Sequence, residues 1–434
     1  MIFSLDVRRA RKGDCLLLHF GSKAQPGLAL IDGGPKGVYK PHLRPRLEEI
    51  RVARELADDE PLPVDLLMVS HVDDDHIQGL LELTRELVEA PRAPLVLIEG
   101  LWHNSFDDII GNDPKELTAA MAAQFGAASL GGDFSDGTAR GMDEVPEAER
   151  EDAFASLQVL ASIEQGHRLR DDARKLGFRL NPQFEGKLIM AGKKKRKLSA
   201  GVEMVVAGPM KPELKKLQDK HDAWLVAQKK KKRPAGASLA AYVDKSVPNL
   251  SSIVTLVTAG EADDRKTMLL TGDARGDKIL QGLEQVGLMK PSGALHVNIL
   301  KVPHHGSSNN VDDDFFERIS ADHYVFSGDG EHGNPERETL EMLFRARGKA
   351  PFELHLTYPI PEIDAARKEE WIKQQSAEKA KAVAGGPKPR KDWSPDRHSL
   401  GAFFKQTKLA RGQSIRTVDA KKSHVIDLLE PLGF

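Results

Sequence analysis

Cysteine is almost absent from this sequence, since Cys15 is the single cysteine in 434 residues. One cysteine permits no intrachain disulfide bond and excludes a zinc site built from several thiolates. A metal bound by this protein would therefore need histidine and carboxylate ligands.

Long apolar runs and an excess of charge of one sign are also missing. No stretch approaches the roughly 20 apolar residues that span a bilayer, so we expect no membrane partner. With 63 basic and 65 acidic residues the net charge is −2, which excludes a globally basic nucleic-acid-binding protein but allows local basic patches. Residues 1–20 resemble two short strands, Ile2–Val7 and Cys15–Phe20, rather than a signal peptide, so we expect a cytoplasmic protein.

The composition, with 40% hydrophobic and 29% charged residues, is that of an ordinary globular protein, and strand and helix signals alternate along it. The apolar run Val64–Val69 predicts a buried strand, and Ile77–Leu87 follows a helical period. Further strands are predicted at Leu28–Ile31, Leu95–Ile98, Met204–Ala207, Ser252–Val257, Thr267–Leu270, His296–Val302 and Ser423–Leu429. Strands near both ends with helices between them predict an α/β fold, a four-layer αββα sandwich.

The chain divides into four predicted parts. Residues 105–240 are polar, mostly helical and partly basic, with a glycine-rich break at Gly126–Gly141, and we interpret them as an insertion into the α/β domain. Residues 376–396 are rich in Lys, Ala, Gly and Pro and predict a flexible excursion. The parts are a first half-domain, the insertion, a second half-domain and a C-terminal extension, at 1–104, 105–240, 241–350 and 351–434.

A cluster of metal-competent side chains, His71-Val72-Asp73-Asp74-Asp75-His76, stands between the buried strand and the helix. In extended backbone, His71 and Asp73 point the same way, and the first helical turn brings Asp75 and His76 toward the same point. Without a cation these groups would repel and desolvate one another. The alternative, an acidic helix N-cap with incidental histidines, does not account for histidines on both sides of three aspartates.

Three more motifs follow predicted strands. Thr271-Gly272-Asp273 ends one strand, Pro303-His304-His305-Gly306-Ser307-Ser308 ends the next, and His332-Gly333-Asn334-Pro335 follows a third. Ligands at the ends of successive strands are a common way to assemble a site in an α/β protein.

These residues resemble the metallo-β-lactamase-fold hydrolases, whose usual signature is His-x-His-x-Asp-His. Asp73 replaces the second histidine, as in the subgroup that contains the soluble domain of ComEC-type DNA-uptake proteins and the phosphorylcholine esterases. The match spans about 1–100 and 245–345 and includes, in order, Gly13-Asp14-Cys15, Asp32-Gly33-Gly34, Asn249 with Ser252, Thr271-Gly272-Asp273, Lys301 with His304-His305-Gly306-Ser307, and His332 near Pro335.

The resemblance implies a role for each matching position. One of His304 and His305 would be a ligand, Asp273 would bridge two ions, and His332 would be a further ligand or a proton donor. Asn249 stands where the family often has a histidine, so a single tightly bound ion is the alternative; His103 or His221 of the inserted segment could fill the gap. The implied metal ligands are His71, Asp73, Asp75, His76, Asp273 and His305; the catalytic residues are Asp75, His304, His332 and Lys301; the substrate-binding residues are Ser307, Ser308 and Asn249.

Ligands of this kind favour zinc, with manganese as the alternative. One or two ions would activate a hydroxide for attack on a phosphodiester. The ComEC-type motifs and two cationic runs, Lys193–Lys197 and Lys229–Arg233, favour a nucleic-acid substrate, although charge runs also occur as solvated loops. The alternatives are a small-ester or phosphorylcholine-type hydrolase, and a non-catalytic, metal-stabilised subunit that binds a protein partner through residues 105–240.

Overall fold

The computed structural model describes residues 1–105, 164–199, 201–212, 214–215, 251–261, 264–383, 386–420 and 422–434. The predictions on Gly126–Gly141, His221, Lys229–Arg233 and Asn249 therefore lie outside the described residues. In the part of the chain that is described, no helix is both long and apolar enough to cross a membrane.

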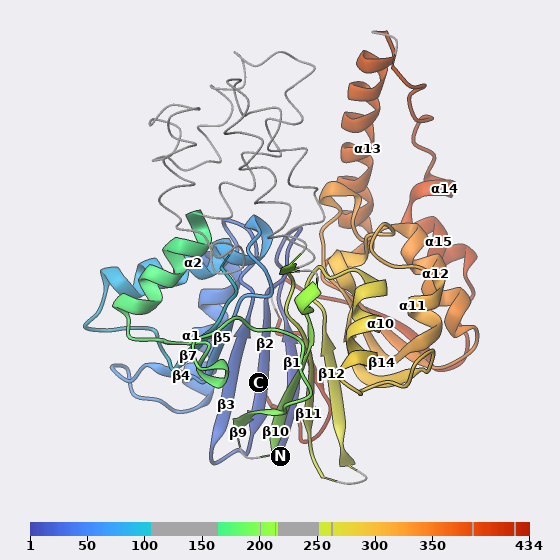
Figure 1. Cartoon of the computed structure of the whole chain (residues 1–434). Helices are drawn as coiled ribbons and strands as arrows, with labels where there is room; N and C mark the ends of the chain where they lie inside the picture. The colour runs from blue at the N-terminus through green and yellow to red at the C-terminus, as the bar shows by residue number, and fades with distance from the viewer. Residues whose placement is uncertain are drawn as a thin grey trace, which may run out of the picture.

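Two large mixed sheets form the centre of the molecule (Figure 1). The first has the order β17-β1-β2-β3-β5-β7-β8 and the second the order β16-β15-β14-β13-β12-β11-β10-β9. The strands of the first sheet are β1 Ile2–Val7, β2 Leu16–Gly21, β3 Pro26–Ile31, β5 Leu66–Met68, β7 Gly100–Trp102, β8 Arg179–Leu180 and β17 Val425–Asp427. Those of the second are β9 Arg196–Ser199, β10 Val202–Gly208, β11 Val254–Ala259, β12 Lys266–Leu270, β13 Leu295–Lys301, β14 Ile319–Phe326, β15 Phe352–Leu356 and β16 Gln413–Thr417. A small third sheet pairs β4 Leu62–Val64 with β6 Val96–Ile98.

Helices flank the two sheets on opposite sides (Figure 1). They are α1 Arg44–Ala53, α2 Asp74–Glu89, α10 Gly276–Gln285, α11 Asp313–Arg318, α12 Arg337–Arg347, α13 Ile360–Val383, α14 Pro395–His398 and α15 Leu400–Gln406. Leu47 of α1 and Leu80 of α2 pack with Leu30 of the first sheet, while Leu283 of α10 and Leu340 of α12 join the apolar cluster of the second sheet. The mixed α/β class predicted from the sequence is confirmed.

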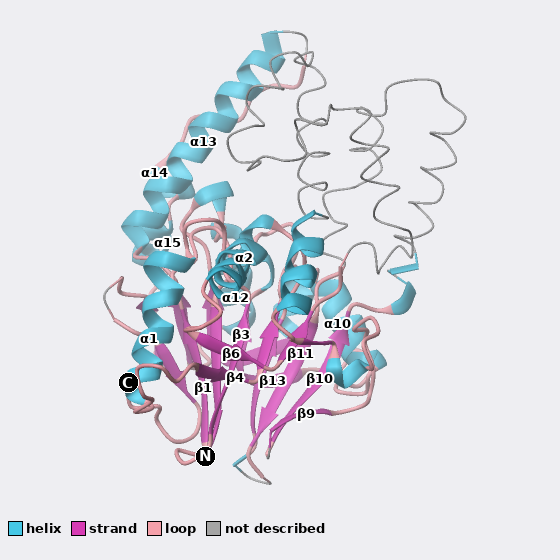
Figure 2. Cartoon of the chain, turned by 90° about the vertical axis from the view of Figure 1, so that its left-hand side faces the viewer, coloured by secondary structure: helices cyan, strands magenta, loops and turns pink. Residues whose placement is uncertain are grey.

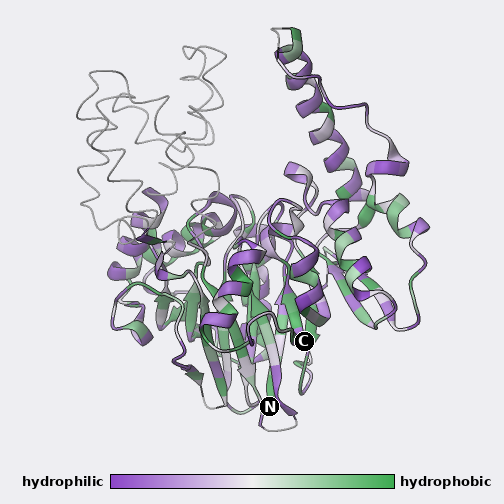
Figure 3. Ribbon diagram, turned by 45° about the vertical axis from the view of Figure 1, so that its right-hand side comes forward, coloured by the Kyte–Doolittle hydropathy of each residue, from purple (hydrophilic) through white to green (hydrophobic). Residues whose placement is uncertain are grey.

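A third apolar cluster lies between the two sheets. It joins Phe3, Leu18 and Met68 of the first sheet to Met268 and Val325 of the second, all fully buried. Alternate residues of the strands thus face either this shared core or the helices, which explains the apolar runs in the central strands. Figure 3 shows the hydrophobic residues concentrated on the strands.

The region after residue 350 contributes strands to both large sheets. Strands β15 and β16 extend the second sheet by parallel pairing, and β17 pairs antiparallel with β1 of the first. The predicted closing strand Ser423–Leu429 contains β17.

The structure differs from the flexible excursion predicted over 376–396. Residues 376–383 belong to α13, a largely hydrophilic helix that projects beyond the sheets (Figures 2 and 3). The segment that follows returns along this helix, where Arg390 forms an ion pair with Glu378 at 2.7 Å and Trp371 donates a hydrogen bond to the Lys391 carbonyl. The Trp371 ring also stacks on His398 with 4.1 Å between the ring centroids. These contacts hold Arg390, Lys391 and His398 against α13, although their surroundings have a low-complexity composition.

Candidate metal centre

The loops that follow parallel strands meet at one edge of the two sheets. Strands β3 and β5 are parallel neighbours in the first sheet, and β12, β13 and β14 are parallel neighbours in the second. Their carboxyl ends carry Asp32, the loop 70–76, Asp273, the turn 303–307 and Ser327 respectively. Strand direction alone therefore gathers the predicted motifs, although they are widely separated in sequence.

The loop between β5 and α2 buries both histidines of the six-residue motif. The Ser70 amide donates to Asp32 Oδ1 at 2.7 Å, which fixes the end of the strand. Asp73 is the N-cap residue of α2, and the amide of His76 donates to its carbonyl oxygen at 2.9 Å. The side chains of His71 and His76 are both fully buried, whereas 21% of the Asp75 side chain is exposed. The helix start thus points one carboxylate and one imidazole inward.

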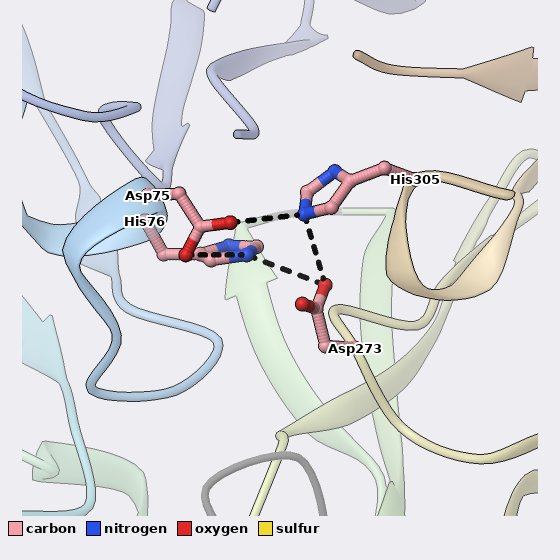
Figure 4. A group of neighbouring side chains, drawn as sticks. All are labelled: Asp75, His76, Asp273 and His305. Carbon is pink, nitrogen blue, oxygen red and sulfur yellow. Dashed lines mark ion pairs between the residues drawn. The ribbon is translucent and has the colours of Figure 1, made fainter. Parts of the chain in front are cut away.

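Asp75, His76, Asp273 and His305 form a compact group (Figure 4). One potential ligand atom from each lies within 4.8 Å of the others. Asp273 Oδ1 is 3.3 Å from His76 Nε2 and 3.5 Å from His305 Nε2, and the latter nitrogen is 3.4 Å from Asp75 Oδ2. Two imidazole nitrogens and two carboxylates that converge in this way are suitable ligands for a divalent transition-metal ion.

The second oxygen of Asp273 faces a different set of side chains. Asp273 Oδ2 is 3.7 Å from His71 Nε2 and 3.6 Å from His304 Nε2. His71 Nε2 is in turn 3.6 Å from Asp73 Oδ2. The two oxygens of one buried carboxylate therefore look into two groups of potential ligands, one on each side.

Several atoms of these groups lack a conventional hydrogen bond. Among the described residues, the Nε2 atoms of His71, His76 and His305 and Oδ1 of Asp273 are buried and make no hydrogen bond. Buried polar atoms are normally satisfied, because leaving one unpaired costs about 1–3 kcal/mol. Three of these atoms face one another on the Oδ1 side of Asp273, and His71 Nε2 faces the Oδ2 side, so the residues present fit bound metal.

Outer residues hold the imidazoles in this orientation. His76 Nδ1 lies 2.9 Å from Asp32 Oδ2, His71 Nδ1 lies 3.1 Å from Ser70 Oγ, and His305 Nδ1 lies 2.8 Å from Ser327 Oγ. Partners of this kind on the outer nitrogen fix the ring and leave the inner nitrogen for a metal. No role was predicted from the sequence for Asp14, Asp32, Ser70 or Ser327. The Gly13-Asp14 and Asp32-Gly33 motifs were the available signal for the two aspartates.

Glycines allow the motif loops to approach closely. A Cβ on Gly13 would lie 1.7 Å from the Asp75 carbonyl oxygen, and a Cβ on Gly79 would lie 2.0 Å from the Gly33 carbonyl oxygen. Both distances are far too short for any side chain, so the α2 start can pack against the Asp14 and Asp32 loops only because these positions are glycine.

Four residues at the same edge have strained backbone conformations. Asp32, His304, His305 and His332 all have positive φ angles, between 47° and 58°. Non-glycine residues rarely adopt this region, and such residues cluster at functional sites where the surrounding structure enforces them. Consecutive positive φ angles at His304 and His305 turn both rings toward Asp273.

In the absence of a metal, the pKa values of the aspartates and histidines in the cluster are set mainly by the charges that they carry toward one another. Burial raises the pKa of Asp273 and Asp75, but the neighbouring histidines outweigh it and hold both pKa values well below the ordinary range. Burial lowers the pKa of His76 and His305, and the surrounding carboxylates, Asp273 first, outweigh it and raise both. The cluster is therefore an assembly of imidazolium–carboxylate pairs, from which an incoming metal would displace protons.

Four predicted residues lie outside the group. Lys301, predicted as a catalytic residue, is fully buried, with Nζ 2.5 Å from Asp14 Oδ2. Ser307 and Ser308, predicted to bind substrate, direct their hydroxyls to Glu336, at 3.3 and 2.7 Å. His332 is half-exposed, with Nε2 3.2 Å from Lys12 Nζ.

His103, which directly follows β7, is also placed by the structure. It is buried, and its amide donates to the Asn181 side chain at 2.9 Å. Lys301 and the two serines each have an acidic partner from a distant segment, which the local sequence does not reveal.

Replacing Asp32 with asparagine should weaken zinc binding by about 10–100-fold, because the outer hydrogen bond to His76 loses its charge. Asparagine matches the shape of aspartate and tolerates the φ of 57° at this position. Isothermal titration of the metal-free protein with zinc measures the change. An affinity equal to that of the unmodified protein would show that Asp32 does not support a metal ligand.

No family model matches the chain. It is 32% identical over 132 residues to microtubule-associated protein 1A of Rattus norvegicus and 30% identical over 141 residues to the protein of that name from Homo sapiens. These matches cover 30% and 32% of this chain but only 5% of each relative, so the chain spans a small fraction of their length.

Solved structures of metallo-β-lactamases also align with the chain. One is a subclass B3 enzyme isolated from a soil metagenome library, with a TM-score of 0.27 and 12% identity over 71% of this chain and 80% of the enzyme. Another, bound to 2-mercaptoethanesulfonate, has a TM-score of 0.26 and 12% identity over 69% of this chain and 81% of the enzyme. These TM-scores are too low to establish a shared fold, so the case for the site rests on its own geometry.

Proposed function

We propose that this protein is a metal-dependent hydrolase with a metallo-β-lactamase-like αββα architecture, and that it acts on phosphodiesters as a nuclease or phosphodiesterase of the ComEC-type subgroup. The position of Asp273 carries the proposal. Its Oδ1 faces His76 and His305, and its Oδ2 faces His71 and His304. A carboxylate placed between two sets of histidines suits a bridge between two ions.

Zinc is the proposed metal and manganese the alternative. His76, His305 and Asp75 would hold one ion on the Oδ1 side, and His71, Asp73 and His304 would hold the other on the Oδ2 side. Metal bound there would lower the pKa of a coordinated water and polarise a phosphoryl oxygen. Asp273 and Asp75 stay ionised at neutral pH because the histidines around them lower their pKa values.

Two histidines are positioned for proton transfer. The His304 side chain is 28% exposed, in contrast to the buried rings around it, so it lies where the cluster opens to solvent. Burial and the adjacent Lys12 ammonium lower the pKa of His332, which keeps this second exposed ring neutral at pH 7. We assign the protonation of the leaving group to His304, which can serve as an acid only if a single ion occupies the Oδ1 side. The neutral imidazole of His332 would serve instead as a proton acceptor or as a further metal ligand.

The cationic run Lys193–Lys197 supports a polyanionic substrate, although not all of its charges are available. Lys195 pairs with Glu203 at 2.7 Å, and the Arg196 guanidinium lies 4.3 Å from the centroid of the Phe184 ring. Lys193, Lys194 and Lys197 are exposed. Phosphate contacts by these three would release counterions and make binding salt-dependent.

In a triple variant, Lys193, Lys194 and Lys197 are each replaced by glutamine. The plot of log affinity for duplex DNA against log salt concentration should then become less steep by about 2–3, because each lost phosphate contact accounts for about 0.9 of the slope. Fluorescence anisotropy over a salt series measures the slope. In the matched control, Lys23, Lys405 and Lys408 are each replaced by glutamine. These lysines are also exposed, so the control removes the same charge from a different part of the surface. Equal slopes in both triple variants would remove this run from the nucleic-acid interface.

A pair of chromogenic substrates separates the proposed activity from its alternatives. A phosphodiesterase should hydrolyse bis(p-nitrophenyl) phosphate only with zinc or manganese present and should leave p-nitrophenyl butyrate almost untouched. The opposite preference would indicate a small-ester hydrolase. Stoichiometric metal without turnover of either substrate would favour a metal-stabilised subunit that needs a protein partner, with residues 105–240 as its docking segment.

A further inference from the structure

A second group of histidines lies away from the candidate metal centre. It comprises His323 on β14, Glu353 and His355 on β15, and His424 in the segment that leads into β17. The parallel register pairs His323 with Glu353 and Val325 with His355. Glu353 and His355 are two residues apart on one strand and so project from the same face. None of these residues belongs to the first centre, and His323 precedes Ser327 by four residues, about 13 Å along an extended strand.

Three atoms of this group form a nearly regular triangle. His323 Nδ1 is 3.1 Å from His355 Nε2, and each of these nitrogens is 3.5 Å from Glu353 Oε2. Tetrahedral zinc holds nitrogen and oxygen ligands at about 2.0–2.2 Å, which places neighbouring ligand atoms about 3.3 Å apart. The three side chains already have the spacing of zinc ligands.

Neighbouring groups orient two of these side chains. Glu353 Oε1 accepts a hydrogen bond from Ser414 Oγ at 2.9 Å and pairs with Arg416 Nε at 2.7 Å, so Oε2 is the oxygen that faces the imidazoles. His355 Nδ1 lies 2.8 Å from His424 Nε2. If His355 donates its Nδ1 proton to His424, its Nε2 lone pair points at Glu353 and His323. A hydrogen bond on the outer nitrogen is the usual support of a metal-bound histidine.

We propose that His323, Glu353 and His355 form a second divalent-metal site, suited to zinc, with His424 as the positioning residue. The site takes two imidazoles and one carboxylate and leaves a fourth position for water or another ligand. His355 is buried, while about a quarter of the His323 side chain is exposed, so an ion can enter from solvent.

The place of the site in the fold gives it a structural role. It spans two neighbouring strands of the second sheet, and through His424 it reaches the segment that enters the first sheet as β17. An ion bound there would fasten this crossing segment to β15 and raise the stability of the folded protein, because it binds only the assembled strands.

Counting metal ions in matched variants of the full chain tests the proposal. The variants are His323→Gln and Glu353→Gln, and the control is His296→Gln, a histidine on β13 whose side chain is 57% exposed and pairs with Asp322. After chelation and dialysis against micromolar zinc, each test variant should hold one zinc fewer per chain than the unmodified protein, and the control should hold the same number. His424→Gln should keep the site but weaken it by about 10–100-fold.

Circular dichroism and the zinc that remains at the first centre show whether each variant is folded. Because this count requires no turnover, it is independent of the proposed hydrolase activity. An unchanged zinc count in folded His323→Gln and Glu353→Gln would overturn the proposal and leave the group as a hydrogen-bonded chain of imidazoles.

Discussion

Replacing Asp273 with asparagine should abolish metal-dependent phosphodiester hydrolysis. The substitution removes the negative charge from a side chain whose two oxygens face four histidines. Loss of a residue that only hydrogen-bonds to a metal ligand typically lowers metal affinity or activity by about 10–100-fold. Removing a ligand shared by two ions should therefore lower kcat/KM by more than about 100-fold. Steady-state hydrolysis of bis(p-nitrophenyl) phosphate with saturating zinc measures the loss.

A nearby aspartate provides the control for this substitution. Asp277 lies in the first turn of α10, four residues further on, and pairs with Arg275 at the surface. Asp277→Asn removes the same charge from the same region and should leave kcat/KM within about twofold, as expected for an exposed position. If Asp273→Asn keeps the activity of this control, the assignment of the centre is wrong.

Replacing Asp6 with asparagine should lower the free energy of unfolding by about 1–3 kcal/mol, because the buried Arg46 loses the charge of one of its two carboxylate partners and keeps only Glu49, at 3.0 Å. Asp6 Oδ2 is 2.6 Å from Arg46 Nε, and both side chains are buried beneath the C-terminal residue. Arg46 also donates to the Phe434 carbonyl at 3.0 Å, so the pair connects β1 and α1 to the chain end. Urea unfolding followed by circular dichroism measures the change, with exposed Asp58→Asn as control.

The ion pair between Asp6 and Arg46 should also make the stability of the fold depend on pH in the acid range. Burial raises the pKa of Asp6, but the hydrogen bond with His19 and the charges of Arg46 and Arg8 outweigh it and lower the pKa from 3.8 to about 2. A carboxyl group with a lowered pKa stabilises the fold above its unfolded value, and this stability is lost as the pH falls toward 2. The loss should be on the order of 2 kcal/mol between pH 5 and pH 2 and should be absent in Asp6→Asn. An equal acid dependence in both proteins would contradict this account.

The sequence was most informative where function depends on short spacings. Asp75 and His76 are adjacent, and the strand-then-helix pattern around them predicts which way they face. The ends of the predicted strands also indicated that Asp273 and His305 would join them, since carboxyl ends of parallel strands share an edge. The structure brings these four side chains together.

Other features depend on contacts that no local pattern contains. Lys301 pairs with Asp14, which lies in the loop before β2 of the other sheet and 287 positions away in the sequence, so no local pattern connects the two. The triangle of His323, Glu353 and His355 exists only because β14 and β15 pair in one register, and a one-residue shift would send the side chains to opposite faces. Arg390 and Lys391 pack along α13 through contacts with Glu378 and Trp371, which composition does not reveal.

Cleavage of nucleic acid by the purified full chain tests the central claim most directly. Single- and double-stranded DNA and RNA would be incubated with chelated protein to which zinc, manganese or no metal is returned, beside the Asp75→Ala/Asp273→Ala double variant. We predict cleavage of at least one polymer that requires zinc or manganese and is lost in the double variant. Cleavage that persists in the folded double variant, or no cleavage by metal-loaded protein, would contradict the nuclease assignment.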